Sequence, residues 1–520
     1  MGCSISGVTV PPPCSGSTTS SIKNRVPLQE CYPYTIIYSQ PVTSLNNLIR
    51  MCTLLTLPNE TLLQIIAETC PDGIEELVLC CKRLHQLAQE SMKQHKADRK
   101  QYWGRFLTWP RNLELRYGFE PAQPICLSEI LFRPRIAYYV QHLCVSHKQL
   151  SGPPRASQPL YSLAMTTQDS AWRDFFARSR CTYISDMDSA HWQEALDRAD
   201  VQTVTSSLLM LLPNLRTFYL TLFNDSSKIS GVVNSIVNAS QSVDRMHASD
   251  TPLSKLCYLR VSHVNRLATT GLWESFAMLP SMRCMRHGDF IREDFERWRS
   301  QEPGRSDIKE LCFEFGDLSM ETLTRLCGHT KSLETFVYND KYARYAEDKT
   351  EDACNLSVLA SLLQAHAGHS LKELCLTIQE PRYFVDPYVR NFVQNFPGPL
   401  RGFDRLEKVE ITFNALLLNN AGTLDVPYLV DILPASLREL HIWVINEFGS
   451  VVELIVKAFA GVGEWKQTKL PRIELVVFRR HMYGNEMTEL PLDNDTKLKC
   501  ESGGISVEVR AWSAWRHELY

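Results

Sequence analysis

A six-residue pattern, with apolar residues at its first, fourth and sixth positions, recurs nine times between residues 200 and 480, although one copy ends in His287. A helical period and a turn containing Pro or Gly precede most copies. A unit of helix, turn and strand cannot bury its apolar face alone, but stacked units bury it together. The pattern therefore predicts an α/β solenoid with a parallel sheet. The copies begin at Leu215, Leu256, Met282, Ile308, Leu333, Leu371, Leu406, Leu437 and Ile473.

The strands of such a solenoid form its concave face, and its helices cover the convex face. Because side chains alternate along a strand, the residues between the apolar positions are expected on the concave surface. These residues are basic in the first copies and acidic in the middle ones, and extended concave surfaces of solenoids bind other molecules. The candidate binding residues are Tyr219, Arg260, Arg286, Glu310, Glu314, Glu373, Glu410, His441 and Trp443. Ordinary solvated strand faces carry similar charges, so this alternative stays open.

A second feature, residues 57–84, reads LPNETLLQIIAETCPDGIEELVLCCKRL. Asn59 is expected to cap a first helix and Asp72 a second. A third helix is expected to open at Lys82 and to run on to Phe106, with apolar residues at helical spacing. So short a segment cannot bury a core alone, so it is expected to dock on something else. A helical hairpin that belongs to another core remains the alternative.

This segment resembles an F-box, because it opens with Leu57-Pro58-x-Glu60 and closes with Cys81-Lys82-Arg83-Leu84. It departs from the family pattern at Thr61, Thr69 and Cys80. The resemblance implies a small three-helix module that binds the Skp1 adaptor and, through it, the cullin of a Skp1–cullin–F-box ubiquitin ligase. The residues expected to bind Skp1 are Leu57, Pro58, Leu62, Leu63, Ile66, Leu77, Cys80 and Leu84.

The repeats resemble leucine-rich repeats in degenerate form, since the expected Asn occurs at its usual place only at Asn414. In addition, residues 133–145, reading RPRIAYYVQHLCV, resemble the start of the ligand-binding half of many filamentous-fungal F-box proteins. Together the two resemblances imply an adaptor whose repeats hold a target protein for ubiquitination.

The first residues are rich in Pro, Ser and Thr, a composition that buries too little apolar surface to order a chain. They are expected to form a disordered tail, residues 1–49. Gly2 and Cys3 lie in a pattern that fits N-myristoylation and palmitoylation, which would add a membrane as a partner. The expected organisation continues with the helical module (50–108), a joining segment with a possible first repeat (109–200) and the solenoid (201–520). A last capping strand is expected at 505–509.

Composition and motifs exclude several classes of function. A net charge of −3 gives no basis for expecting nucleic acid as a partner. No P-loop, GxSxG, HExxH or zinc-spaced Cys/His cluster occurs, so we expect no enzyme, catalytic residue, metal or cofactor. The odd set of 17 cysteines and the lack of an 18-residue apolar run predict a cytoplasmic or nuclear protein. The main prediction is a ubiquitin-ligase adaptor, and the alternative is a repeat scaffold or ligand sensor that does not direct degradation.

Overall fold

The computed structural model divides the chain into two compact units, Met1–Pro58 and Asn59–Tyr520, and every helix and strand given below lies in the second. The predicted tail with Gly2 and Cys3, and most of the joining segment, lie outside the described residues. These are 56–70, 73–102, 127, 129–131, 133–146, 194–195, 200–222, 227–242, 252–263, 272–288, 306–314, 320–340, 356–378, 399–416, 418–420, 423–425, 427–444, 449–480 and 492–511.

The second unit is built on an eleven-stranded sheet in which every strand is parallel to its neighbours and the spatial order follows the chain. This confirms the α/β class and the parallel sheet. Each predicted copy supplies one strand, and the possible early copy and the capping strand supply the first and the last. The strands are β1 (His142–Ser146), β2 (Thr217–Leu222), β3 (Tyr258–His263), β4 (Cys284–His287), β5 (Glu310–Phe313), β6 (Thr335–Asp340), β7 (Glu373–Ile378), β8 (Lys408–Thr412), β11 (Glu439–Val444), β12 (Leu475–Arg480) and β13 (Ser506–Ala511).

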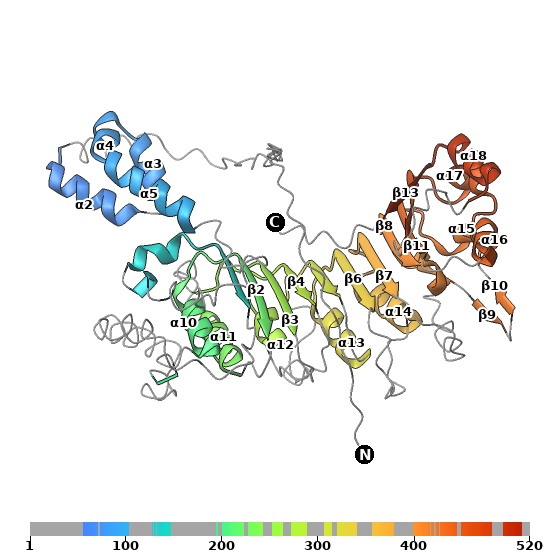
Figure 1. Ribbon diagram of the computed structural model, residues 1–520, viewed down its shortest axis with the longest axis horizontal. Coiled ribbons are helices and arrows are strands. Elements are labelled where there is room, and N and C mark those ends of the chain that lie inside the picture. Colours follow the sequence, from blue (N-terminus) through green and yellow to red (C-terminus); the bar gives the residue numbers. More distant parts are fainter. Residues whose placement is uncertain are drawn as a thin grey trace, which may run out of the picture. The chain divides into compact units, whose positions relative to one another are not determined.

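Helices lie along one side of this sheet (Figure 1). Most crossovers between described strands contain one, as parallel pairing requires a long connection. The helices are α10 (Val201–Leu211), α11 (Ser227–Ser242), α12 (Leu272–Ala277), α13 (Met320–His329), α14 (Leu356–Ala367), α15 (Leu429–Ile432), α16 (Gly449–Ala458), α17 (Trp465–Thr468) and α18 (Asn494–Ser502). Short 3-10 turns η5 (Leu400–Gly402), η6 (Phe413–Leu416) and η7 (Val462–Glu464), and a hairpin of β9 (Leu418–Asn420) and β10 (Thr423–Asp425), complete this part.

The core lies between the sheet and the helices. Register places one residue of every strand in a row, and the row that runs through Phe218, Met285 and Phe336 is apolar in all eleven strands. The second row on this side is apolar except at His287, which is buried against the ring of Trp273 with centroids 5.2 Å apart. One continuous apolar layer therefore extends through the sheet.

The edge at which the strands begin is held by a repeated backbone bond. The carbonyl of the residue before a strand accepts N–H groups from two successive residues of the next repeat, as Arg283 O does from Lys309 N at 2.7 Å and Glu310 N at 3.0 Å. Serines in these turns add a second link. Ser281 Oγ, for example, donates to the carbonyls of Leu253 and Leu256 at 3.0 and 2.8 Å. These bonds fix each turn on its neighbour.

The segment predicted as a three-helix module forms four helices. They are α2 (Asn59–Thr69), α3 (Ile74–Leu79), α4 (Lys82–Leu87) and α5 (Gln89–Tyr102). The prediction of one long third helix is wrong, because the chain turns at Ala88, whose N–H bonds back to the carbonyl of Leu84 at 2.9 Å. The expected cap of α3, Asp72, lies outside the described residues.

Asn59 does not serve as a cap that precedes the first helix, because it is the first residue of α2. Its side-chain oxygen accepts from Nε and Nη2 of Arg83, at 3.2 and 2.6 Å. The bonds join the start of α2 to the start of α4, where Cys81 Sγ accepts from Leu84 N at 3.4 Å. The start of α2 and the start of α4 thus lie against each other.

Polar contacts join the helical module to the residues before β1. Tyr139, which follows the 3-10 turn η1 (Pro134–Tyr138), has its hydroxyl 3.3 Å from Cys70 Sγ and 2.9 Å from His95 Nδ1. At the end of α5, the hydroxyl of Tyr102 donates to Glu129 at 3.0 Å and accepts from Arg133 at 3.0 Å. Because Tyr139 and Tyr102 are both buried, these bonds satisfy groups that would be costly to leave unpaired.

Two helices are missing from the sequence predictions. The first is α18, which Asp493 caps by accepting from Thr496 N at 2.6 Å. Helix α11 was not anticipated, because its Ser and Asn residues have low helix propensity. Its apolar residues Ile229, Val233 and Ile236 are nevertheless spaced by three or four and buried in the core.

Candidate binding surfaces

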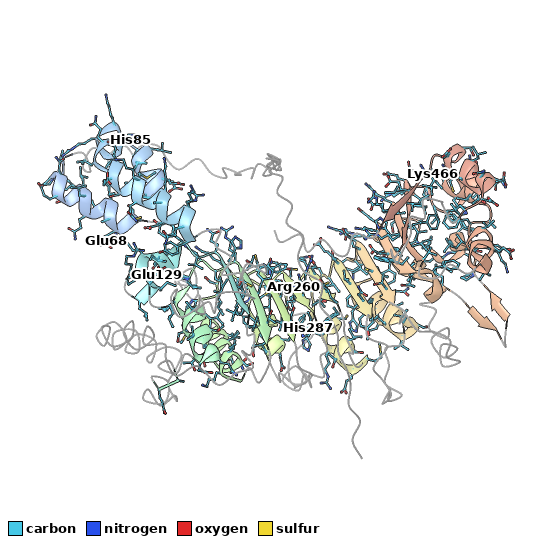
Figure 2. All side chains as sticks on the ribbon, in the orientation of Figure 1. Glu68, His85, Glu129, Arg260, His287 and Lys466 are labelled. Atoms are coloured by element: carbon cyan, nitrogen blue, oxygen red, sulfur yellow. The ribbon has the colours of Figure 1, made fainter. Side chains whose placement is uncertain are left out.

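The side of the sheet opposite the helices carries the predicted binding residues, and we call it the polar face. Register aligns Tyr219, Arg260 and Arg286 in one row that continues to Glu410 and His441. Glu310, Glu373 and Trp443 belong to parallel rows on the same side, two residues away. Arg260 and His287, labelled in Figure 2, belong to the polar face and the core respectively. The alternation of the sequence thus predicted this face correctly.

At the first end of the polar face lies a cluster that we call the tyrosine–arginine cluster, made of Tyr219, Tyr258, Arg260, Arg286, Glu310 and Glu314. The two tyrosine rings are tilted, with centroids 5.4 Å apart, and the guanidinium of Arg286 lies 5.8 Å from the centroid of Tyr258. Arg286 also donates from Nε and Nη2 to Glu310 Oε1 at 2.9 and 2.6 Å.

Each arginine of this cluster is neutralised by a glutamate from a later repeat. Arg260 Nη2 lies 2.8 Å from Oε2 of Glu314, whose side chain is almost fully buried. The expectation of a basic first end and an acidic middle is therefore wrong. The charges meet as pairs, because the arginines of β3 and β4 reach the glutamates at β5.

The middle of the polar face is lined by small side chains, two of which are thiols. Cys312, Val337 and Cys375 occupy consecutive places in its central row. Burial raises the pKa of the Cys312 thiol and that of the Cys375 thiol. Both are therefore protonated at neutral pH and poor nucleophiles. This floor can contact an apolar or small side chain, but it lacks an activated cysteine.

At the last end lies the tryptophan–arginine cluster, made of Glu410, Glu439, His441, Trp443 and Arg479. Trp443 Nε1 donates to Glu410 Oε1 at 2.6 Å, and the guanidinium of Arg479 lies 5.5 Å from the Trp443 ring centroid. Arg479 Nη1 is 3.5 Å from Glu410 Oε1, and its Nη2 is 3.1 Å from His441 Nδ1. The Nε atom of Arg479 has no hydrogen-bond partner among the described residues.

The environment of Glu410 keeps it ionised. Burial raises the pKa of its carboxyl, but the hydrogen bond with His441, the charge of Arg479 and the hydrogen bond from Trp443 outweigh burial, so the pKa is lowered. A buried carboxylate with this many partners is costly to replace. Within the cluster, Glu439 and Arg479, with 44% and 29% of their side chains exposed, are the members that a ligand can reach.

The predicted residues of the polar face differ in accessibility. Glu314, Glu410, His441 and Trp443 are each less than 10% exposed, and only the edges of their side chains can contact a ligand. Glu373 has 51% of its side chain exposed and lies 3.8 Å from Lys408. Alternation predicts the side of the sheet, whereas exposure depends on neighbouring side chains.

The helical module has an interior of its own. Leu62, Ile66 and Leu84 were predicted to insert into a partner, but each is at most 1% exposed. They pack within the module. The prediction that these three residues insert into a partner is therefore wrong. Among the other predicted residues, Leu63, Pro58 and Cys80 are exposed, while Leu57 and Leu77 are half-buried.

Two residues that sequence reasoning missed are informative. Leu79, at the end of α3, has 81% of its area exposed, the highest value among the exposed large apolar residues of the described part. Leu79 lies off the apolar stripe predicted for this helix. An apolar residue on the side facing away from that stripe is the sequence signal that could have identified it. Arg479 was missed because its strand reads as an almost continuous apolar run, LVVFRR.

The described residues contain no group of three or more His, Cys, Asp or Glu side chains suited to a metal ion. In the same part of the chain, no helix combines the length and the apolar character that crossing a membrane requires. The ten described cysteines are free thiols.

Comparison with known proteins gives no family assignment. No protein-family model matches the chain, and no curated protein matches its sequence.

Proposed function

We propose that the protein is the substrate-recognition adaptor of a Skp1–cullin–F-box ubiquitin ligase. The observation that carries the proposal is the exposed apolar surface of a helical module whose own interior is filled. Leu79 and Leu63 are 81% and 43% exposed, and Pro58 and Cys80 are exposed as well. Large apolar side chains that a small module leaves in solvent favour a protein–protein interface.

In this proposal the surface around Leu79 binds Skp1, and Skp1 binds the cullin. Burying an exposed leucine is worth about 1.5–3 kcal/mol, so two leucines provide a substantial part of a micromolar or tighter affinity. The interior residues Leu62, Ile66 and Leu84 act indirectly, because they hold α2, α3 and α4 in place.

The polar face would hold the target protein. Arg286, Arg479 and Glu373 are among its accessible charged groups, and small side chains line the floor between the two clusters. No bond chemistry is needed from this chain, because holding a target lysine near a ubiquitin-charged enzyme raises its effective concentration.

The direct experiment is co-purification of the full chain with Skp1. We expect retention by the wild type and its loss in Leu63→Asp/Leu79→Asp. The control Gln86→Asp adds an acid at an exposed polar site of α4 and should have no effect. Failure of the wild type to retain Skp1 would rule the proposal out.

A ligand sensor that does not direct degradation is the second candidate. It is favoured by the unpartnered Nε of Arg479 and by Oδ1 of Asn339, which is 1% exposed and also lacks a partner in the described part. Retention of Skp1 without cullin in the same co-purification would favour this candidate.

A further inference from the structure

Strand β13 occupies one edge of the sheet, because β12 is its only partner among the described strands. We call its other side the open edge. At the opposite edge of the sheet, the core residues Leu143 and Val145 of β1 are fully buried, whereas Val507 and Val509 of β13 are only half-buried. The sequence of β13, SVEVRA, contains no Pro or Gly. Such an edge is a template for pairing with another strand.

The backbone of β13 directs alternate residues toward β12. Ser506 N donates to the carbonyl of Glu474 at 2.8 Å. In a parallel pair, a residue that bonds to its neighbour does so with both its N–H and its C=O, and the next residue points the other way. Val507, Val509 and Ala511 therefore direct both groups to the open edge, where no described strand pairs with them. These groups can form a second ladder.

The charged side chains of β13 have no complement on β12. On the polar face, Glu508 lies opposite Val477. Arg510 lies opposite Arg479, and like charges directly opposite each other destabilise a pair of strands. Arg510 pairs instead with Glu508 of its own strand, at 2.7 Å, and both side chains remain about half exposed. A carboxylate supplied from the open edge would balance the charge of Arg510.

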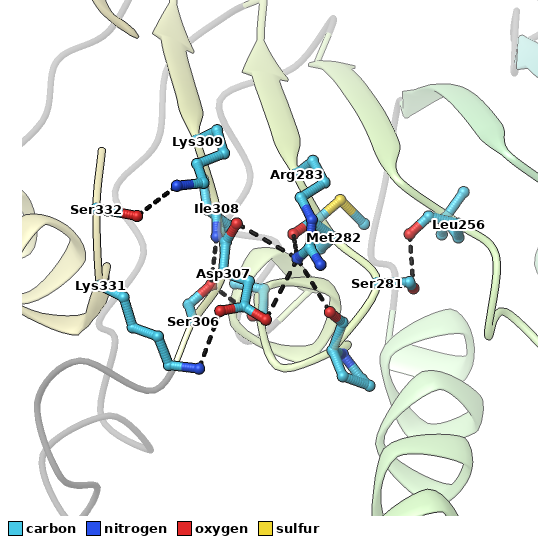
Figure 3. Close-up of polar contacts among 12 residues, drawn as sticks. Leu256, Ser281, Met282, Arg283, Ser306, Asp307, Ile308, Lys309, Lys331 and Ser332 are labelled. Atoms are coloured by element: carbon cyan, nitrogen blue, oxygen red, sulfur yellow. Dashed lines mark hydrogen bonds and ion pairs between the residues drawn. The ribbon is translucent and has the colours of Figure 1, made fainter. Parts of the chain in front are cut away.

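Elsewhere in the molecule, neighbouring repeats bring opposite charges together. Asp307 lies between residues of the two adjoining turns, 3.5 Å from Arg283 Nη1 and 2.9 Å from Lys331 Nζ, as the close-up in Figure 3 shows. Within the sheet, Glu373 of β7 is directly opposite Lys408 of β8, at 3.8 Å. An acid and a base on adjoining strands is the arrangement that β12 does not give to β13.

We propose that the open edge pairs with the open edge of a second copy of the chain, antiparallel and centred on Val509. In this register Val509 lies opposite Val509 of the second copy, and the two residues exchange both backbone bonds. Val507 and Ala511 pair in the same way on either side of the centre. Glu508 of each copy then lies opposite Arg510 of the other. This is a non-hydrogen-bonded pair, in which the side chains approach most closely.

The order of the charges favours a second copy over an unrelated strand. An acid followed by a base two residues later is complementary to the same sequence read backwards, as a two-fold symmetric contact requires. A centre moved to Glu508 or to Arg510 would place like charges directly opposite each other. A centre on Val507 would place Arg510 opposite Gly504, without a carboxylate. This interaction goes beyond the adaptor function and does not require it.

The test is sedimentation velocity of the full chain at about 1–100 µM, the range in which a small interface is expected to dissociate. The wild type should change from monomer to dimer across this range. Glu508→Arg and Arg510→Glu each replace two attractive pairs by two repulsive ones, so each variant should dimerise about tenfold more weakly. The control Glu90→Arg also turns an exposed, ion-paired acid into a base, on α5, and should dimerise like the wild type.

An equimolar mixture of the two charge variants separates the contact between copies from the ion pair within β13. In the mixed dimer every base lies opposite an acid of the other copy, although both chains have lost the internal pair. The affinity of the mixture should therefore return to within about threefold of the wild type. A wild type that stays monomeric, a dimer that neither variant weakens, or a mixture that does not recover would each overturn the proposal.

Discussion

The helical module and the sheet bury their apolar residues in different ways. The module has a small interior, to which Leu62, Ile66, Ile74, Val78 and Leu84 belong, and these residues are not part of the main core. The sheet shares one core that runs from Tyr102 to Ile505. The module leaves Leu79 and Leu63 in solvent, whereas the exposed residues of the sheet are largely charged.

The difference follows from size. A module of a few short helices has too little volume to cover all its apolar residues, so the uncovered ones are available to a partner. Stacked repeats cover one another, so recognition by the sheet depends on charges, rings and hydrogen bonds. The following predictions test this division, from the largest expected effect to the smallest.

The largest effect is expected in the core of the sheet. Phe336 is fully buried, with its ring centroid 5.9 Å from that of Phe313. Phe336→Ala should lower the free energy of unfolding by about 3–5 kcal/mol, because it removes a large side chain and leaves a cavity. The control Thr335→Ala, one residue away on the polar face, should cost less than about 1 kcal/mol. Urea denaturation followed by circular dichroism measures both, and equal costs would contradict the placement of the core.

A smaller effect is expected in the tryptophan–arginine cluster. Glu410→Gln should cost about 1–3 kcal/mol at neutral pH, because it removes the charge that Arg479 and His441 face. The pKa of Glu410 is lowered in the folded protein, so its contribution is fully present above its unfolded pKa and is lost as the pH falls through the folded value. The difference in unfolding free energy between wild type and variant should therefore shrink in acid. A difference independent of pH would contradict this account of the cluster.

Almost no effect on folding is expected at the surface of the module. Leu79→Asp should change the free energy of unfolding by less than about 0.5 kcal/mol, because the side chain is exposed. The matched interior change Leu62→Asp should unfold the module, because it buries a charge. Helical content and thermal melting distinguish the two, and a large loss for Leu79→Asp would mean that this residue serves the fold.

Thiol labelling of the native protein needs no substitution, so it tests the burial of individual side chains without any effect on stability. Cys80 is exposed and should react readily with a thiol reagent, whereas the buried Cys312 on the polar face should react only after unfolding. Mass spectrometry of labelled peptides reads out each site. Rapid labelling of Cys312 in the folded protein would contradict its burial in the floor of the polar face.

The strands and their two faces were predictable because alternation of apolar residues determines which side of a sheet each residue occupies. The partners on the polar face were not. Arg260 and Glu314 are 54 residues apart, and no local pattern indicates which glutamate an arginine reaches. In the module, periodicity identified Leu62 and Leu84 as apolar-face residues. It could not show whether the chain's own helices or a partner cover that face. The turn at Ala88 has no Pro or Gly to signal it.

The measurement that tests the division of roles most directly is hydrogen–deuterium exchange of the full chain with and without Skp1. The account predicts that Skp1 slows exchange around Leu79, within α2, α3 and α4, and leaves strands β2–β12 unchanged. Absence of protection anywhere, or protection confined to the strands, would contradict it.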